Sequence, residues 1–104
     1  MFKLQIVYTQ EAQQDILQIS DYHLRMVSPD SAERAVIRLL EHIEKLEEFP
    51  RMGEEHPDER LRFAGFRKLV HESHIIVYRI EQDKTVIIER IAWASSDYPE
   101  LLIQ

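Results

Sequence analysis

The sequence predicts an α+β domain of order β-α-α-β-β-β, in which a two-helix hairpin packs on one face of a four-stranded, mainly antiparallel sheet. Two observations predict this fold. Apolar residues recur at helical spacing through the first half of the chain, and three β-branched runs follow one another at short spacing in the last third. With 104 residues, 44% of them apolar, and 2 glycines, the chain has room for a single domain over residues 1–104 around one core.

The first strand and the first helix are predicted from a change in apolar period. Every second residue from 2 to 8 is apolar, which is typical of a half-buried strand. Thr9 then offers an N-cap hydroxyl, and Glu11 places an anion in the first turn, where the helix dipole favours it. The stripe that this helix would bury consists of Ala12, Ile16, Ile19, Tyr22 and Met26.

The second helix is predicted to start at Ser28-Pro29, because serine caps helices and proline suits the first helical position. It ends near Phe49-Pro50, and the proline- and glycine-containing stretch 50–59 is predicted to be a loop. Strands are expected over about 61–71, 74–81 and 85–94, with turns near 72–73 and 82–83. Eight residues are predicted to be buried: Ile16, Ile19, Leu39, Ile43, Leu46, Val77, Ile87 and Ile91.

Composition limits the classes of function. The chain has no cysteine, so it has neither disulfides nor a thiolate metal site, and no apolar run approaches the roughly 18 residues of a membrane span. A cytoplasmic protein with no membrane partner is expected. The net charge of −6 is uneven: residues 60–92 carry 7 Lys/Arg against 4 Asp/Glu, and the rest of the chain is acidic. A role with nucleic acid would therefore depend on the strand region.

An arginine recurs in each of the three C-terminal runs, at Arg67, Arg79 and Arg90. On a strand an arginine is a fixed cation, so the three predict a basic face that matters more for function than for folding. The structural alternative is that they form solvated ion pairs across the strands. The acids available for such pairs are Glu72, Glu81 and Glu89.

Other residues have plain structural interpretations. Trp93 is interpreted as a core or rim aromatic, and residues 95–97 as a turn or cap before the short segment 98–102. His71 and His74 flank a turn, but adjacent strand residues alternate faces and no further ligand is apparent, so no metal is predicted. No cofactor is expected.

The order of elements and a set of short motifs resemble the RelE/ParE superfamily, the toxins of bacterial type II toxin-antitoxin (plasmid stabilisation) systems. The resemblance covers nearly the whole chain. Its motifs are Tyr-Thr-x-x-Ala at Tyr8, Phe-Pro-x-x-Gly at Phe49, Arg-Lys-Leu-Val at Arg67, Val-Tyr-Arg-Ile at Val77, and an ending from Arg90 to Asp97 similar to Arg-Ile-x-His-x-x-Arg-Asp.

The RelE-like branch of this superfamily cleaves messenger RNA on the ribosome, using basic and tyrosine side chains to activate the ribose 2′-hydroxyl and protonate the leaving oxygen. Here Trp93 and Ser96 stand where the ending has His and Arg, and Ile75 stands where this branch commonly has an arginine. For a ribonuclease, the resemblance assigns catalysis to Lys68, Arg67, Arg90 and Tyr98.

These departures favour the ParE-like branch, whose members resemble this chain and bind DNA gyrase without catalysis of their own. The chain is accordingly expected to be a growth-inhibiting toxin rather than an enzyme. Binding of a target or partner is assigned to Arg67, Arg79, Arg90 and Trp93. A RelE-like endoribonuclease acting on ribosome and mRNA, and a degenerate, non-toxic interaction module, remain the alternatives.

The resemblance also implies a cognate antitoxin, whose disordered segment folds across the toxin as a helix and an added strand. The candidate groove for it lies between the helix pair and the sheet. Assembly as a homodimer or as a hetero-oligomer with the antitoxin is compatible with the sequence, which does not identify the cellular target.

Overall fold

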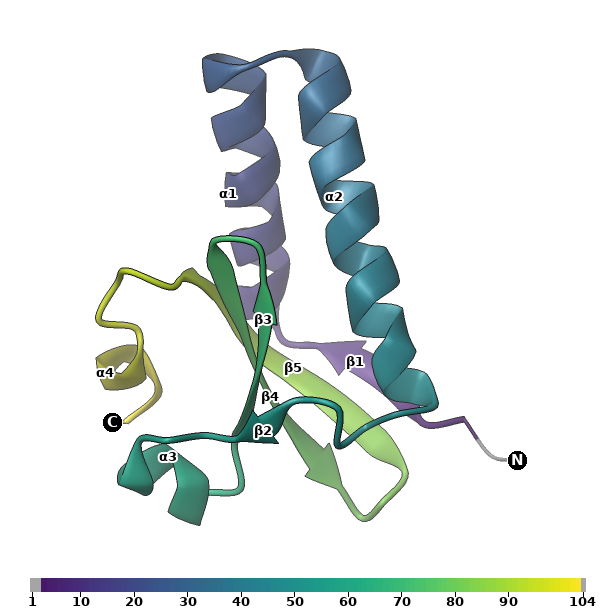
Figure 1. The fold of residues 1–104 in the computed structure, drawn as a ribbon, viewed down its shortest axis with the longest axis vertical. Coiled ribbons are helices and arrows are strands. Elements are labelled where there is room, and N and C mark those ends of the chain that lie inside the picture. Colours follow the sequence, from purple (N-terminus) through teal and green to yellow (C-terminus); the bar gives the residue numbers. More distant parts are fainter. Residues whose placement is uncertain (1–2, 104) are drawn as a thin grey trace.

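A computed structural model describes residues 3–103 and arranges them as a helical hairpin above a twisted sheet (Figure 1). The five strands lie in the order β1-β5-β4-β3-β2, with β1 parallel to β5 and the other pairs antiparallel. The predicted α+β fold is confirmed, with one short strand more than expected. The elements are β1 (Gln5–Tyr8), α1 (Gln10–Met26), α2 (Pro29–Glu44), the 3-10 turn η1 (Lys45–Glu47), β2 (Glu54–Glu55), α3 (Glu59–Phe63), β3 (Arg67–His71), β4 (His74–Glu81), β5 (Thr85–Trp93) and α4 (Pro99–Leu102).

Both predicted helix starts are confirmed by their caps. The Thr9 side chain accepts a hydrogen bond from the Ala12 amide at 3.0 Å, and its hydroxyl donates to the Glu89 carbonyl at 2.9 Å. Ser28 accepts from the Ser31 amide at 3.1 Å. The N-cap of α1 therefore also ties the helix to β5. Phe2, which belonged to the predicted strand pattern, lies outside the described residues.

The helical hairpin extends well past the edge of the sheet (Figure 1). Ala12 and Ile19, in the part of α1 over the sheet, are buried, whereas Tyr22 is 39% exposed and Met26 is 70% exposed. The apolar stripe of α1 is thus continuous in the sequence but covered for only part of its length. Among residues 3–103, no strand lies beneath the far end of the hairpin (Figure 1).

The sheet has two apolar faces, and a bulge in β5 determines which side chains point to each. Val77 pairs with Arg90 and Tyr78 pairs with Ile88, so Glu89 is an extra residue between them. We call the face that packs on the hairpin the helix face. It carries Leu69, Ile76, Tyr78, Val86, Ile88 and Ile91, packed against Ala12, Ile19, Leu39, Ile43 and Leu46.

The opposite face, which we call the second face, is covered by the end of the chain. Ile75 and Val77 are buried there with Tyr98. Phe66, Ala92 and Leu102 pack around them. The segment after β5 therefore closes this side of the sheet.

Six of the eight residues predicted to be buried are buried, and two are half-buried. Ile16 packs on the rim of the helix-face core. Ile87 pairs with Arg79, between the fully buried Val86 and Ile88. The prediction for Ile87 was wrong because a continuous apolar run does not show which parity faces the core.

Residues 59–63 form helix α3, although a strand was predicted from residue 61. Asp58 caps this helix by accepting from the Arg60 amide at 2.9 Å. Gly65 follows its end with φ +88°, a conformation that glycine adopts freely. The Asp58 cap before these residues and the glycine after them therefore outweighed the β propensity of the apolar residues between.

Candidate interaction site

The three strand arginines do not form one basic face. Residues in register on antiparallel strands share a face, and Arg67 lies opposite Tyr78, whereas Arg90 lies opposite Val77. Tyr78 belongs to the helix-face core and Val77 to the second face. The single basic face predicted from the sequence is therefore wrong.

Arg67 is held by the loop before β2. Its Nε donates to the Gly53 carbonyl at 3.0 Å, and its Nη2 lies 3.5 Å from the Arg51 carbonyl. The guanidinium thus satisfies backbone acceptors of a loop that has little regular structure of its own. This is a structural role, and no carboxylate in the described part of the chain takes part in it.

Arg90 forms a two-pronged ion pair with Asp15 of α1. The Nε–Oδ2 distance is 2.9 Å and the Nη2–Oδ1 distance is 3.0 Å, and Asp15 Oδ2 also accepts from the Ile91 amide at 2.8 Å. The hydrogen bonds with Asp15 raise the pKa of Arg90, which keeps it charged. None of the predicted acids is its partner, because the partner is 75 residues away in sequence.

Arg79 alone follows the predicted pattern of ion pairs across the strands. Its Nε lies 2.8 Å from Glu89 Oε1, and its Nη1 lies 3.5 Å from Glu81 Oε2. About a third of its side chain remains exposed, at 36%. Such a pair contributes about 0–1 kcal/mol to stability.

Lys68 and Arg90 lie in one row across the sheet, on either side of Val77. Lys68 Nζ is 3.5 Å from Glu54 Oε1. Tyr98 is buried against the same face, with its Oη 2.8 Å from His56 Nε2. Of the four residues that the resemblance assigns to ribonuclease catalysis, these three are neighbours of one face, and Arg67 is not.

His56, which was not among the residues predicted from the sequence, is 2% exposed. The Asp58 amide donates to its Nδ1 at 3.0 Å, so the neutral ring carries its proton on Nε2 and donates it to Tyr98 Oη. Burial, with Lys68 nearby, lowers the pKa of His56. No sequence signal links this loop histidine to a tyrosine 42 residues further on.

These contacts decide what the second face can do chemically. Cleaving RNA without a metal requires free, fixed cations and an accessible proton donor. Arg90 and Lys68 each have a carboxylate partner, and Tyr98 is 7% exposed because it packs against Ile75 and Val77. The arrangement therefore supplies buried structural contacts rather than an open catalytic cluster.

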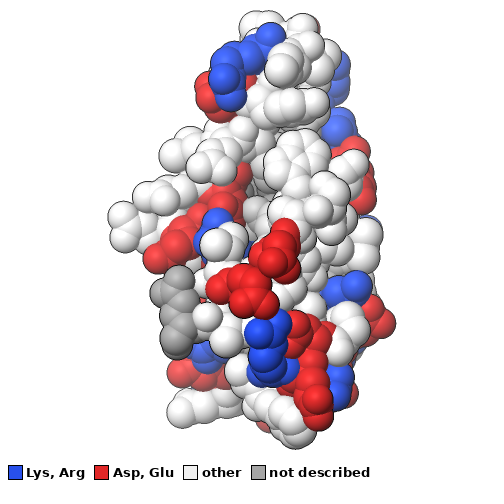
Figure 2. Space-filling model, turned by 90° about the vertical axis from the view of Figure 1, so that its left-hand side faces the viewer, with Lys and Arg blue, Asp and Glu red and all other residues white. Residues whose placement is uncertain are grey.

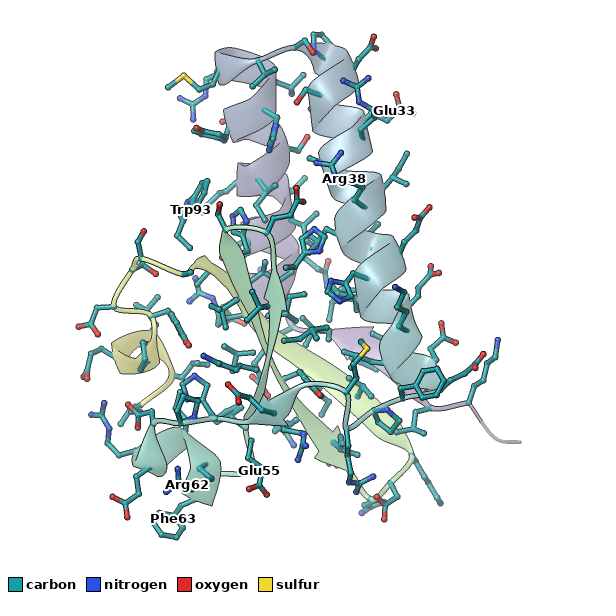
Figure 3. All side chains as sticks on the ribbon, viewed as in Figure 1. Glu33, Arg38, Glu55, Arg62, Phe63 and Trp93 are labelled. Carbon is teal, nitrogen blue, oxygen red and sulfur yellow. The ribbon has the colours of Figure 1, made fainter. Side chains whose placement is uncertain are left out.

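Trp93 lies at the rim of the helix face, where β5 ends beside α1 (Figure 3). Trp93 is 43% exposed, and the centroid of its ring lies 4.2 Å from that of His74 and 5.4 Å from that of Tyr22, which it meets edge-on. His74 is buried beneath it, and its Nε2 has no hydrogen-bond partner among residues 3–103. Trp93 is thus a large aromatic group held in place by its neighbours and open on one side.

A contact between two histidines joins α2 to β3. His71 and His74 share a face because they pair in register across a two-residue turn, and His42 Nδ1 lies 2.9 Å from His71 Nδ1. The alternation of faces expected from the sequence does not separate them, because they lie on two different strands. Within the described part of the chain, no group of three ligand-type side chains could hold a metal ion.

Lowering the pH from about 7 to 5 should destabilise the protein. Burial lowers the pKa of His42, His56 and His74 from about 6.5. The unfolded chain therefore binds more protons in this range, so the stability present above pH 6.5 is lost as the pH falls. Asp58, with a pKa of about 2 set by its hydrogen bonds from Arg60, does not titrate there.

Urea unfolding followed by circular dichroism at half-unit pH steps measures the free energy of unfolding at each pH, and so its slope against pH. His56→Gln should have a shallower slope than the unaltered chain, because it removes one of the three groups. A slope of opposite sign, or an unchanged slope in the variant, would contradict the assignment.

The motifs that suggested a family have structural roles here. Tyr78 Oη accepts from the Gly53 amide at 3.0 Å and donates to the Pro50 carbonyl at 2.7 Å, so Phe-Pro-x-x-Gly meets Val-Tyr-Arg-Ile in space. Thr9 and Ala12 make the α1 cap described above. The fold and these contacts define a small α+β toxin domain of the RelE/ParE type.

Comparison with known proteins identifies the branch. The family described as "ParE toxin of type II toxin-antitoxin system, parDE" matches residues 6–98. The chain therefore belongs to the ParE toxin family. No curated protein matches it.

Two solved structures are similar to this chain. One, from the chromosomal ParDE toxin-antitoxin system of P. aeruginosa, has 25% sequence identity and a TM-score of 0.74, covering 88% of this chain and 96% of that one. The other, from the RelBE2 toxin-antitoxin complex of Mycobacterium tuberculosis, has 21% identity and a TM-score of 0.64, covering 88% and 98%. The second similarity shows the fold alone. No helix among residues 3–103 is long and apolar enough to cross a membrane.

Proposed function

We propose that this ParE-family chain stops growth by binding a protein target, DNA gyrase, and that a cognate antitoxin neutralises it. The observation that carries the proposal is that Arg67, Lys68, Arg90 and Tyr98 all have partners within the chain. Groups engaged in this way are poorly placed to activate a ribose hydroxyl. The ParDE similarity supports an antitoxin partner. A toxin that acts on gyrase would act in the cytoplasm, which is the location we propose.

The exposed surface suits binding to a protein. Large apolar side chains are exposed along α1 and near the end of the chain, among them Leu17 at 69%, Trp93 at 43% and Leu101 at 52%. Tryptophan is one of the residues most enriched among interface hot spots. Of the four residues assigned to binding from the sequence, we infer that Trp93 and Arg79 contact a partner, and that Arg67 and Arg90 hold the surface in place.

One observation favours the RelE-like alternative. Lys68 and Arg90 do share a face with the buried Tyr98, as a composite ribonuclease site would require. The weight lies against it, because Trp93 and Ser96 replace the histidine and arginine of the RelE-like ending and Tyr98 is buried against the sheet.

Inducible expression with and without the antitoxin, encoded beside the toxin gene, tests the proposal. Expression alone should arrest growth and switch on a DNA-damage reporter within a few generations, whereas co-expression should restore growth. Primer extension on translated messages should give the same pattern in induced and uninduced cells. Codon-specific cuts after induction would assign the chain to the RelE-like activity, and normal growth without the antitoxin would favour the degenerate module.

A further inference from the structure

Two adjoining hollows run between α1 and the end of the chain. One, of about 190 Å³, is lined by residues of α1 and β5 that include Gln18 and Trp93. The other, of about 430 Å³, is lined by Glu11, Glu89 and Leu102 among others. Arg90 and Leu101 line both, so the two form one depression, which we call the C-terminal groove.

The edge of β5 is open along this groove. β1 covers β5 from Thr85 to Ile88 and then turns away into α1. The Ala94 amide donates to the Ser73 carbonyl, on the β4 side, and backbone groups alternate sides along a strand. The Ile91 carbonyl and the Trp93 amide therefore face the groove instead of β4.

The neighbouring groups on this edge are already occupied. The Asp15 side chain accepts from the Ile91 amide. The Trp93 carbonyl accepts two hydrogen bonds from Ser96, one from its amide at 3.0 Å and one from its hydroxyl at 2.7 Å. On this edge, the Trp93 amide and the Ile91 carbonyl have no hydrogen-bond partner among residues 3–103. A residue placed beside Ala92 in the parallel orientation, the orientation of β1, would use both.

The groove has an apolar end and an acidic end. At the apolar end stand Trp93 and Leu101, 43% and 52% exposed. At the other end Glu11 and Glu89 flank Arg90, which Asp15 already neutralises. Glu89 pairs with Arg79, whereas Glu11 forms no ion pair among the described residues. Acidic groups gather across the middle of this side of the molecule (Figure 2).

We propose that the C-terminal groove receives a short extended segment of the antitoxin, which carries an apolar side chain toward Trp93 and Leu101 and a lysine or arginine toward Glu11. This rests on the proposed function and adds the place and the chemistry of recognition. The Glu11 carboxylate, which forms no ion pair among residues 3–103, favours a basic segment by charge complementarity, and the two free backbone groups limit the strand pairing to about one residue.

Calorimetric titration of the chain with its antitoxin, the product of the adjacent reading frame, tests this. Trp93→Ala and Leu101→Arg should each weaken binding by about ten-fold or more, because they remove the anchor or place a cation against the basic segment. Glu11→Lys should weaken it several-fold and reduce its dependence on salt. Thermal melts check that each variant is folded. If Trp93→Ala does not fold, Leu101→Arg still tests the inference, because Leu101 is 52% exposed and its replacement should leave the fold intact.

Two control variants lie away from the groove. Glu33→Lys makes the same charge change on exposed α2, and Phe63→Ala removes an aromatic ring that is 82% exposed on α3 (Figure 3). Both should bind within about two-fold of the unaltered chain, since exposed residues outside an interface contribute little.

The outcomes separate this inference from the proposed function. If the antitoxin binds the unaltered chain and the groove variants alike, the groove inference is wrong and the toxin assignment stands. If sedimentation shows that the isolated chain is a dimer that Trp93→Ala dissociates, a second copy occupies the groove and the inference is also overturned. An antitoxin that does not bind the unaltered chain would refute both.

Discussion

Replacing Asp15 by alanine should lower the free energy of unfolding by about 3–5 kcal/mol, because it leaves the partly buried Arg90 guanidinium without its counter-charge. The same change removes the acceptor of the Ile91 amide, a buried hydrogen bond of 2.8 Å. For a domain of this size, the corresponding fall in Tm is more than about 10 °C. Urea unfolding followed by circular dichroism measures it.

The matched control is Asp21→Ala, on the same helix. Asp21 pairs with Arg25 at 3.3 Å, but both side chains are more than half exposed, at 63% and 72%, so its loss should cost less than about 1 kcal/mol. Arg90→Ala should resemble Asp15→Ala, since it leaves a buried carboxylate. The expectation from the sequence that Arg90 matters little for folding is therefore revised. Equal stability of Asp15→Ala and Asp21→Ala would contradict the account.

Replacing Gly53 by alanine should cost about 2–3 kcal/mol through overpacking. A Cβ there would lie 2.5 Å from the Lys68 carbonyl oxygen and 2.7 Å from Tyr78 Oη. The first of these atoms is backbone in the sheet and cannot move freely. The second is tied by the hydrogen bonds to Gly53 and Pro50, which the clash would disrupt.

Gly65→Ala is the comparison that separates crowding from backbone strain. Gly65 has φ +88°, and nothing lies within 4 Å of the Cβ that alanine would add. Its substitution should cost about 1 kcal/mol, from the unfavourable conformation alone. Thermal melts of the two variants should therefore rank Gly53→Ala as the less stable. The reverse order would mean that the loop at Gly53 moves to make room for the methyl group, which would contradict the prediction.

Most of the fold follows from local signals in the sequence. Thr9 and Ser28-Pro29 mark the helix starts, and the apolar stripes of the helices identify Ile19, Leu39 and Ile43 as core. The two turns near 72 and 82 follow from polar residues between β-branched runs. These features depend on neighbours a few residues apart, which is the range over which periodicity and capping act.

The features that decide the site depend on contacts distant in sequence. The parity of β5 changes at the Glu89 bulge, so no pattern could place Ile87 away from the hairpin or Arg90 opposite Val77. Asp15 looks like a solvated helix residue until the fold brings it to Arg90. For the same reason three strand arginines that look alike in sequence have three different environments.

A supercoiling assay with purified DNA gyrase tests the central claim most directly. The account predicts that the purified chain inhibits supercoiling of relaxed plasmid in proportion to its concentration, and that adding the antitoxin restores the activity. Because the proposed action is binding, the inhibition needs neither ribosomes nor RNA. Unimpaired supercoiling at saturating toxin, together with cleavage of messenger RNA in a translating extract, would contradict it.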